Sequence, residues 1–255
     1  MGTVPRPADE PDIAVEFRGT SKAFGRLQVL AGLDLQIRRR ETLTIIGGSG
    51  SGKTVILKLI VGLLKPEAGQ ILVEGEDIVP LREEDLFRVR RRVGFLFQGA
   101  ALFDSLTVAE NVAYPLREHS RMDDAHIATR VREVLALVGL DGIEAKVPAA
   151  LSGGMRKRVG LARAIALAPS LILYDEPTTG LDPQNTAKIN DLIRDLQQKL
   201  GVTSVVVTHD MHSAFKISGR IAMLREGRIA ALGSPEELQR SSHEFVKDFI
   251  AGRIE

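Results

Sequence analysis

Residues 47–54 combine a glycine-rich run with a lysine and a threonine at a spacing that suits phosphate binding. They read Gly47, Gly48, Ser49, Gly50, Ser51, Gly52, Lys53 and Thr54, which fits G-x-x-x-x-G-K-[ST] at every fixed position. Such a backbone can point successive N–H groups at phosphate oxygens, and a following helix N-terminus adds partial positive charge. Lys53 offers a cation to the β- and γ-phosphates, and Thr54 offers a hydroxyl to Mg²⁺. The pattern predicts binding of a nucleoside triphosphate, with a plain glycine-rich turn as the alternative.

Two adjacent acids, Asp175 and Glu176, follow the apolar run at residues 171–174. In phosphate chemistry the first acid can hold Mg²⁺, usually through a water molecule, and the second can orient and deprotonate the attacking water. An acidic turn after a strand is also common, so the pair alone decides little. Next to a phosphate-binding loop, we expect the two acids to take part in the chemistry.

A second glycine-rich element, Leu151-Ser152-Gly153-Gly154-Met155, precedes a basic amphipathic segment. Ser152 is a favourable N-cap residue, and Gly153 and Gly154 let backbone N–H groups approach a ligand closely. The element could form a second anion site at a helix N-terminus. On physical grounds alone, a helix cap with a flexible approach is the simpler interpretation. A second phosphate clamp makes sense in a dimer whose clamps close on each other's nucleotide.

Four short, apolar, β-rich runs lead into these polar residues. The runs are residues 42–46, 93–97, 171–174 and 203–208, and they are followed by the 47–54 loop, Gln98, the acidic pair and His209. Helical patterns separate several of the runs, which favours a mainly parallel sheet covered on both faces. Ligands of such sheets lie outside the carboxyl ends of the strands. We therefore expect four strand ends to converge on one site.

Other segments frame this sheet. Residues 13–18 and 28–37 predict strands around a turn at 24–26, and residues 221–225 and 228–232 predict a second strand pair. Apolar residues at helical spacing in 123–138 and 152–168, with no strand run between, predict a helical insert. Ser234, followed by a proline and then Glu237, predicts a capped helix start.

The amino-acid composition limits the classes of protein to which this chain can belong. The 255 residues carry 34 basic and 33 acidic side chains, a net charge of +1, and no cysteine. This balance is not that of a nucleic-acid-binding protein, so we expect no nucleic-acid partner. No apolar run approaches the roughly 18 residues of a membrane span, and residues 1–12 indicate a flexible arm rather than a signal peptide. Together with the missing cysteines, this predicts a cytoplasmic protein.

Six motifs in a fixed order resemble those of the ATP-binding subunits of ABC transporters. They are residues 47–54, Gln98, LSGGM at 151–155, LILYDE at 171–176, Gly180-Leu181-Asp182 and His209. The resemblance covers about residues 13–240. It implies an α/β fold: a P-loop NTPase core with a mainly parallel sheet, a small N-terminal antiparallel β subdomain and a helical subdomain at about 99–168. A C-terminal helical tail at 241–255 would follow.

The resemblance also implies roles for individual residues, with ATP and Mg²⁺ as cofactors. Phe24 would stack on adenine, Ser152, Gly153 and Gly154 would face the opposite subunit's γ-phosphate, and Asp182 would couple the two sites. Glu176 would be the general base, His209 would touch the γ-phosphate, and Gln98 would sense Mg²⁺ and water. The metal would be held by Thr54, Gln98 and Asp175. Gly48 departs from the proline that the family often has, and Met155 replaces the usual glutamine.

Met155 and the segment after Gln98 narrow the resemblance. LSGGM, the run at residues 98–108 and Glu110-Asn111-Val112 are similar to the ATPases of Mla-type phospholipid transporters. This implies a homodimer, a membrane permease, an MCE-type lipid-binding component and a place on the cytoplasmic face of the inner membrane. Residues 99–117 would be the dock for the permease, although Leu102 and Phe103 could instead seal the insert against the sheet.

Several alternatives remain open. Amino-acid and lipoprotein transporters share much of the same pattern. A non-transport ATPase of DNA repair or translation often carries coiled-coil inserts or tandem nucleotide domains, and neither is seen. A nucleotide-sensing module could dispense with Glu176. The arginines at 38–40 and 88–92 are interpreted as solvated charged faces, and His209 with His212 lacks a third metal ligand.

Overall fold

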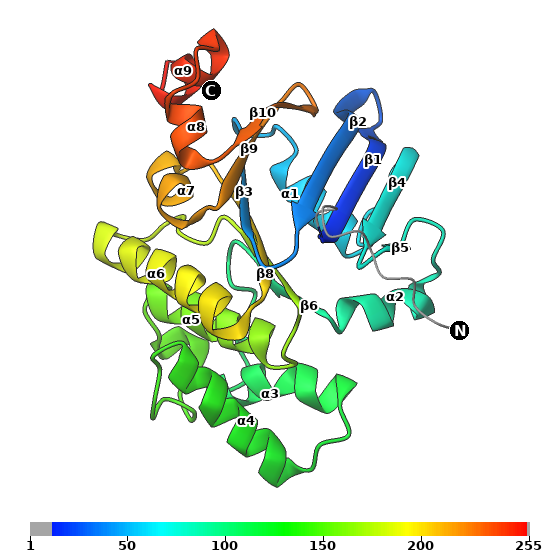
Figure 1. Cartoon of the computed structure of the whole chain (residues 1–255). Coiled ribbons are helices and arrows are strands. Elements are labelled where there is room, and N and C mark those ends of the chain that lie inside the picture. The colour runs from blue at the N-terminus through cyan, green and yellow to red at the C-terminus, as the bar shows by residue number, and fades with distance from the viewer. Residues whose placement is uncertain (1–11, 254–255) are drawn as a thin grey trace.

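Two β-sheets organise the protein, as the computed structural model in Figure 1 shows for residues 12–253. The predicted arm at 1–12, apart from Asp12, lies outside the described residues, as do the last two residues of the predicted tail. No helix within residues 12–253 is long and apolar enough to cross a membrane.

The smaller sheet is antiparallel, with strand order β2-β1-β4-β5. Its strands are β1 (Ile13–Phe24), β2 (Leu27–Arg38), β4 (Ala68–Val73) and β5 (Glu76–Asp77). The first two turn at Gly25, whose φ of +60° costs glycine little. The predicted N-terminal strand pair is confirmed. The strands β4 and β5 are not among the predicted ones, because exposed Ala68, Gly69 and Gln70 interrupt the apolar pattern.

The larger sheet has strand order β10-β9-β3-β8-β7-β6 and is parallel except for β10. Its strands are β3 (Thr42–Ile46), β6 (Val93–Leu96), β7 (Leu171–Asp175), β8 (Thr203–Thr208), β9 (Arg220–Arg225) and β10 (Arg228–Gly233). Every residue of β3, β7 and β8 is buried, as expected for strands covered on both faces. The mainly parallel sheet predicted from the four apolar runs is confirmed.

The helices are α1 (Lys53–Ile60), α2 (Glu83–Arg90), α3 (Val108–His119), α4 (Asp124–Leu137), the 3₁₀ turn η1 (Pro148–Ala150), α5 (Gly153–Ile165), α6 (Pro183–Leu200), α7 (Met211–Ile217), α8 (Pro235–Gln239) and α9 (Glu244–Ile250). Most of the helices lie around the larger sheet, and α3 and α4 pack on α5 beyond it. The predicted start at Ser234 is confirmed as a capping box in which Ser234 and Glu237 satisfy each other's backbone N–H groups.

Two large apolar clusters hold the layers together. One joins α1, the inner face of the antiparallel sheet and one face of the larger sheet. The other joins the opposite face to α5 and α6 and continues into α3 and α4. Figure 1 shows α3 and α4 at the bottom of the molecule, remote from β1, β2 and β4. The buried apolar residues within 131–140 and 189–196 lie in the second cluster.

The helix α2 was interpreted only as part of a charged face. Its arginines form exposed ion pairs, Arg88 with Glu76 and Arg90 with Glu83. Only Leu86 and Val89 of this helix are buried, so hydrophobic periodicity over eight residues is too weak to reveal it. The interpretation of these arginines as a solvated face agrees with the exposure of Arg88, whereas Arg90 is only partly exposed and also donates to the carbonyl oxygen of Val61 at 2.9 Å.

Candidate functional site

The loop between β3 and α1 requires its glycines. Gly50 and Gly52 have φ values of +75° and +103°. A Cβ on Gly52 would lie 2.6 Å from Cγ1 of Val29, and one on Gly47 would lie 2.7 Å from the carbonyl oxygen of Leu224. The loop therefore curls tightly at the carboxyl end of β3 because both backbone freedom and the absence of a side chain are needed there.

Lys53 opens α1 and is buried inside the curl of this loop. Its Nζ donates hydrogen bonds to the carbonyl oxygens of Gly47 at 2.7 Å and Gly48 at 2.9 Å. Burial lowers the pKa of Lys53, while the nearby carboxylates of Glu176 and Asp175 act in the opposite direction. The ammonium thus lies in a dry, preorganised position where it can meet a phosphate oxygen.

Thr54 and Asp175 join the ends of two different strands. Oγ1 of Thr54 donates a hydrogen bond of 2.8 Å to Oδ1 of Asp175, across 121 residues of sequence. Burial raises the pKa of Asp175, and the Thr54 hydrogen bond opposes that rise. A nearby cation would favour the charged carboxylate, so this buried oxygen pair suits a hard divalent ion. Residues 12–253 hold no cluster of three histidine, cysteine, aspartate or glutamate ligands. Beside Thr54, Asp175 and the predicted Gln98, further ligands would be phosphate and water oxygens.

Glu176 is held on all sides. Its backbone has a φ of +47°, and its N–H donates to the carbonyl oxygen of Val207 at 2.9 Å. Oε2 accepts hydrogen bonds from Thr179 at 3.1 Å and Thr208 at 3.3 Å and lies 3.0 Å from Nδ1 of His209. A left-handed non-glycine residue costs about 1–3 kcal/mol, and such strain persists where the surroundings fix it. The carboxylate is therefore aimed rather than free to rotate.

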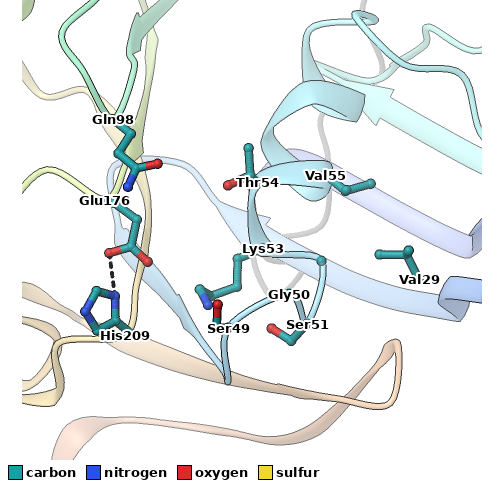
Figure 2. Close-up of a pocket in the computed structure, with 11 residues that line it drawn as sticks. Val29, Ser49, Gly50, Ser51, Lys53, Thr54, Val55, Gln98, Glu176 and His209 are labelled. Atoms are coloured by element: carbon teal, nitrogen blue, oxygen red, sulfur yellow. Dashed lines mark ion pairs between the residues drawn. The ribbon is translucent and has the colours of Figure 1, made fainter. Parts of the chain in front are cut away.

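These groups line one cavity of about 460 Å³, which Figure 2 shows in close-up. The loop and α1 form one side, and Gln98, Glu176 and His209 stand opposite. The lining residues are Val29, Ser49, Gly50, Ser51, Gly52, Lys53, Thr54, Val55, Gln98, Glu176 and His209. Segments that follow β3, β6, β7 and β8 thus meet, as expected from the four strand ends.

Other predicted site residues lie outside this cavity. Phe24 ends β1 with 47% of its surface exposed, and the ammonium of Lys22 lies 5.2 Å from its ring centroid. Gly47 and Gly48 contact Lys53 but are not among the lining residues. Asp175 is buried behind Thr54.

Ser152, Gly153 and Gly154 lie outside this cavity, at the start of α5. Ser152 is the N-cap, and its hydroxyl accepts a 3.2 Å hydrogen bond from the N–H of Met155. A Cβ on Gly154 would lie 2.8 Å from Oδ1 of Asn185, so the helix start packs closely on the start of α6. Asp182 caps α6 by accepting from the N–H of Asn185 at 2.9 Å. The two elements expected to face a partner subunit therefore lie side by side.

Five contributors to the site are not predicted from the sequence. Val29 and Val55 line the cavity, Thr179 and Thr208 hold Glu176, and Lys157 bonds to the backbone of Glu176. Val55 directly follows the predicted loop. Thr179 gives a weak signal because it follows the acidic pair closely. Val29, Thr208 and Lys157 reach the site only through tertiary contacts, which no local pattern reveals.

Comparison of the sequence with known proteins identifies the family of the chain. The ABC transporter family profile matches residues 30–179. The chain is 42% identical over 241 residues to the probable ribonucleotide transport ATP-binding protein mkl of Mycobacterium leprae (strain TN), spanning 94% of this chain and 70% of that protein. It is 41% identical over 238 residues to the intermembrane phospholipid transport system ATP-binding protein MlaF of Haemophilus influenzae (strain ATCC 51907 / DSM 11121 / KW20 / Rd), spanning 93% and 90%.

A solved structure of an ATP-binding cassette has the same fold as this chain. The dimeric post-hydrolysis state of the ATP-binding cassette MJ0796, bound to ADP and Pi, superimposes with a TM-score of 0.80 and 34% identity. The match covers 87% of this chain and 98% of that one. With the phosphate-binding loop, the aimed carboxylate and these relatives together, the chain belongs to the ABC transporter family and is an ATP-hydrolysing subunit of such a transporter.

Proposed function

We propose that this ATPase works as a homodimer that powers phospholipid transport through a membrane permease on the cytoplasmic face of the membrane, with an MCE-type lipid-binding component. The observation that carries the hydrolytic part is the single cavity in which Lys53 faces Glu176 and His209. The lipid part rests on the relative named for phospholipid transport, since this chain aligns with 90% of the length of that relative. It also rests on the LSGGM form of the second glycine-rich element.

Hydrolysis follows from the positions of the side chains. The loop N–H groups and Lys53 would bind the phosphates, and Glu176 would accept the proton of the attacking water. Thr179 and Thr208 hold one oxygen of Glu176, which fixes the direction of the carboxylate. His209, next to that oxygen and exposed to the cavity, would contact the γ-phosphate. Thr54, Asp175 and Gln98 would hold Mg²⁺, and the charge that this ion supplies when bound would neutralise that of the phosphate oxygens.

Replacing Lys53 with Ala is expected to weaken ATP binding by about 10–100-fold, the equivalent of a charge-assisted hydrogen bond of ~1.5–3 kcal/mol. Titration with a fluorescent ATP analogue measures the change. Lys65 serves as the matched control, since its ammonium also donates to a backbone carbonyl, that of Leu81, outside the cavity. Unchanged affinity in Lys53→Ala, or an equal loss in Lys65→Ala, contradicts the role of Lys53.

We further propose that the permease docks beside α3. Within the predicted dock at 99–117, Ala100 and Val108 are buried in the interior and are not available for contact with a partner, so the proposed surface is narrower than the whole segment. Phe103 and Tyr114 are each more than 40% exposed, and their ring centroids are 4.9 Å apart. They line a cavity of about 360 Å³ together with Phe95, Phe97, Leu167 and Arg163. An exposed apolar hollow rimmed by arginines suits a short amphipathic helix of a partner.

Replacing Phe103 with Asp is expected to abolish association with the permease and transport, while leaving folding and ATP binding near wild type. A half-exposed side chain contributes little to the core, so the free energy of unfolding should change by about 0.5 kcal/mol. Co-purification and thermal melting measure the two effects. Leu200→Asp, an equally exposed change at the end of α6, is the control. A collapse of thermal stability in Phe103→Asp would place this ring in the core and the dock elsewhere.

The cargo is tested by isolating the native chain from solubilised membranes and identifying the proteins and lipids that accompany it. Lipid transport predicts a permease, an MCE-type protein and bound phospholipid. The relative named for ribonucleotide transport supports a second candidate, a polar cargo, with no lipid enrichment in the isolated complex. Phospholipid in the complex and lipid-stimulated hydrolysis favour the first candidate, and their absence favours the second.

A further inference from the structure

Lys157, on α5, is a buried cation that, among the described residues, donates its hydrogen bonds to backbone oxygens. Its side chain is 6% exposed, and no ion pair among residues 12–253 includes it. Its Nζ donates to the carbonyl oxygen of Gln98 and, at 3.1 Å, to the carbonyl oxygen of Glu176. Lysine is almost never fully buried without a compensating partner, so this arrangement calls for a reason.

Burial makes the charge costly. It lowers the pKa of Lys157, while the carboxylates of Asp175 and Glu176 act in the opposite direction. An apolar side chain would fill the same space without desolvating a charge. What the ammonium adds is a pair of directed bonds between segments that local structure does not connect.

Those segments are two of the three that face the phosphate-binding loop, the third being that of His209. Gln98 follows β6 and Glu176 follows β7, and these strands are paired in parallel. Lys157 joins both from a third element, α5, whose first turn begins at Ser152. One side chain thus links the loop of Gln98, the loop of Glu176 and the helix that carries the second glycine-rich element.

The rest of the loop after Gln98 is held by the same helix. Arg163 donates to the carbonyl oxygens of Ala100 and Ala101, both at 2.7 Å. These two residues have φ values of +63° and +48°, a conformation that costs energy outside glycine. Arg163 therefore fixes the far end of the loop, and Lys157 fixes the near end, at the residue whose side chain lines the cavity.

The bond to Glu176 has a geometric effect on its side chain. The N–H of Glu176 donates to the carbonyl oxygen of Val207, and its own carbonyl oxygen accepts from Lys157 at 3.1 Å and from the N–H of Thr179 at 3.3 Å, so both sides of a left-handed residue are held. Loss of the Lys157 bond would leave this carbonyl to the longer, local Thr179 bond, and the residue could rotate toward a more common conformation. The carboxylate would then leave its contacts with Thr179, Thr208 and His209.

We propose that Lys157 is a positioning residue for ATP hydrolysis, which holds the backbones of Gln98 and Glu176 in register with each other and with the start of α5. The proposal rests on the roles assigned to Gln98 and Glu176 in the proposed function. It implies that a movement of α5, as when Ser152 meets a partner's nucleotide, is passed directly to the general base.

The test compares Lys157→Met, which keeps the length of the side chain, with Lys157→Gln, which keeps a donor. Phosphate release by the full chain gives kcat and KM for ATP, and a fluorescent ATP analogue gives the affinity. Since a misplacement of about 1 Å can cost about 100-fold, kcat of Lys157→Met should fall about 10–100-fold. KM and nucleotide affinity should stay within about threefold, because the loop at 47–54 is not bonded to Lys157. Lys157→Gln should recover part of the lost kcat.

Arg130→Met is the matched control, because Arg130 also donates to two backbone carbonyls, those of Ala166 and Ile165, from a helix outside the cavity. It should keep wild-type kcat per folded molecule, with the folded fraction measured by circular dichroism. Wild-type kcat in Lys157→Met overturns the proposal, as does a loss that merely follows the folded fraction. If Lys157→Met does not fold, Lys157→Gln decides. A decrease of both kcat and nucleotide affinity in Lys157→Gln overturns the proposal. The proposed function has a separate test: if Glu176→Gln turns over ATP at the wild-type rate, Glu176 is not the general base. That result would also overturn the proposal for Lys157, because the proposal depends on Glu176.

Discussion

Replacing Glu176 with Gln is expected to slow ATP hydrolysis by about 10²–10⁴-fold while ATP binding stays intact, because the variant loses a general base and little else. Gln has the shape of Glu, and its amide oxygen can still accept from Thr179 and Thr208, so the local structure should hold. Phosphate release at saturating ATP measures the loss, and analogue titration measures the affinity.

Glu237→Gln is the control for this variant. Glu237 also accepts hydrogen bonds in a capping arrangement, with Ser234 on α8, but it does not line the cavity. Its turnover should match that of the wild type. If Glu176→Gln hydrolyses ATP within about threefold of the wild-type rate, another group must accept the proton, and the assignment of the base is wrong.

Replacing Ser152 with Arg is expected to prevent ATP-dependent dimerisation while leaving ATP binding to single chains unchanged. Ser152 caps α5 outside the cavity of its own chain, so its predicted contact is with the nucleotide of the other subunit. A bulky cation at this helix start would clash with a closing partner and oppose the positive end of the helix dipole.

Light scattering on chains that also carry Glu176→Gln measures this effect. Mg-ATP should shift the Glu176→Gln chain from 27.8 kDa to twice that mass, and the chain with both changes should stay at the monomer mass. Thr129→Arg, an exposed change on α4, serves as the control and should still dimerise. If the molar mass of the Glu176→Gln chain is the same with and without Mg-ATP, the shared-site interpretation is contradicted. It is also contradicted if the chain with Ser152→Arg dimerises normally.

The parts of this protein that sequence predicts best are those where chemistry and local structure coincide. The run from Gly47 to Thr54 needs positive φ values and close backbone approach, so its glycines are visible as a motif. The strands β3, β7 and β8 are mainly apolar, are buried throughout and lead into polar residues, which gives both the sheet and its functional edge. Their meeting at one cavity follows from parallel order alone.

The parts that sequence misses depend on contacts between distant residues. Lys157 reaches Gln98 across 59 residues, and Thr208 reaches Glu176 across 32. In the sequence, Lys157 is one of several cations on an amphipathic helix, and only the fold shows that it points inward. Hydrophobic residues mislead in the same way, since Ala100 is buried while Phe103, three residues later, is exposed. Burial of this kind is set by neighbouring elements rather than by residue type.

The central claim is that two copies of this chain form two ATP sites, each built from both copies. A structure of the Glu176→Gln chain with ATP and Mg²⁺ tests it most directly. The account predicts a dimer in which each triphosphate lies between residues 47–54 of one copy and residues 152–154 of the partner subunit. It also predicts that Gln98, His209 and the side chain at position 176 of the first copy surround the γ-phosphate. A nucleotide enclosed by one chain alone, with Ser152 facing solvent, would contradict the account.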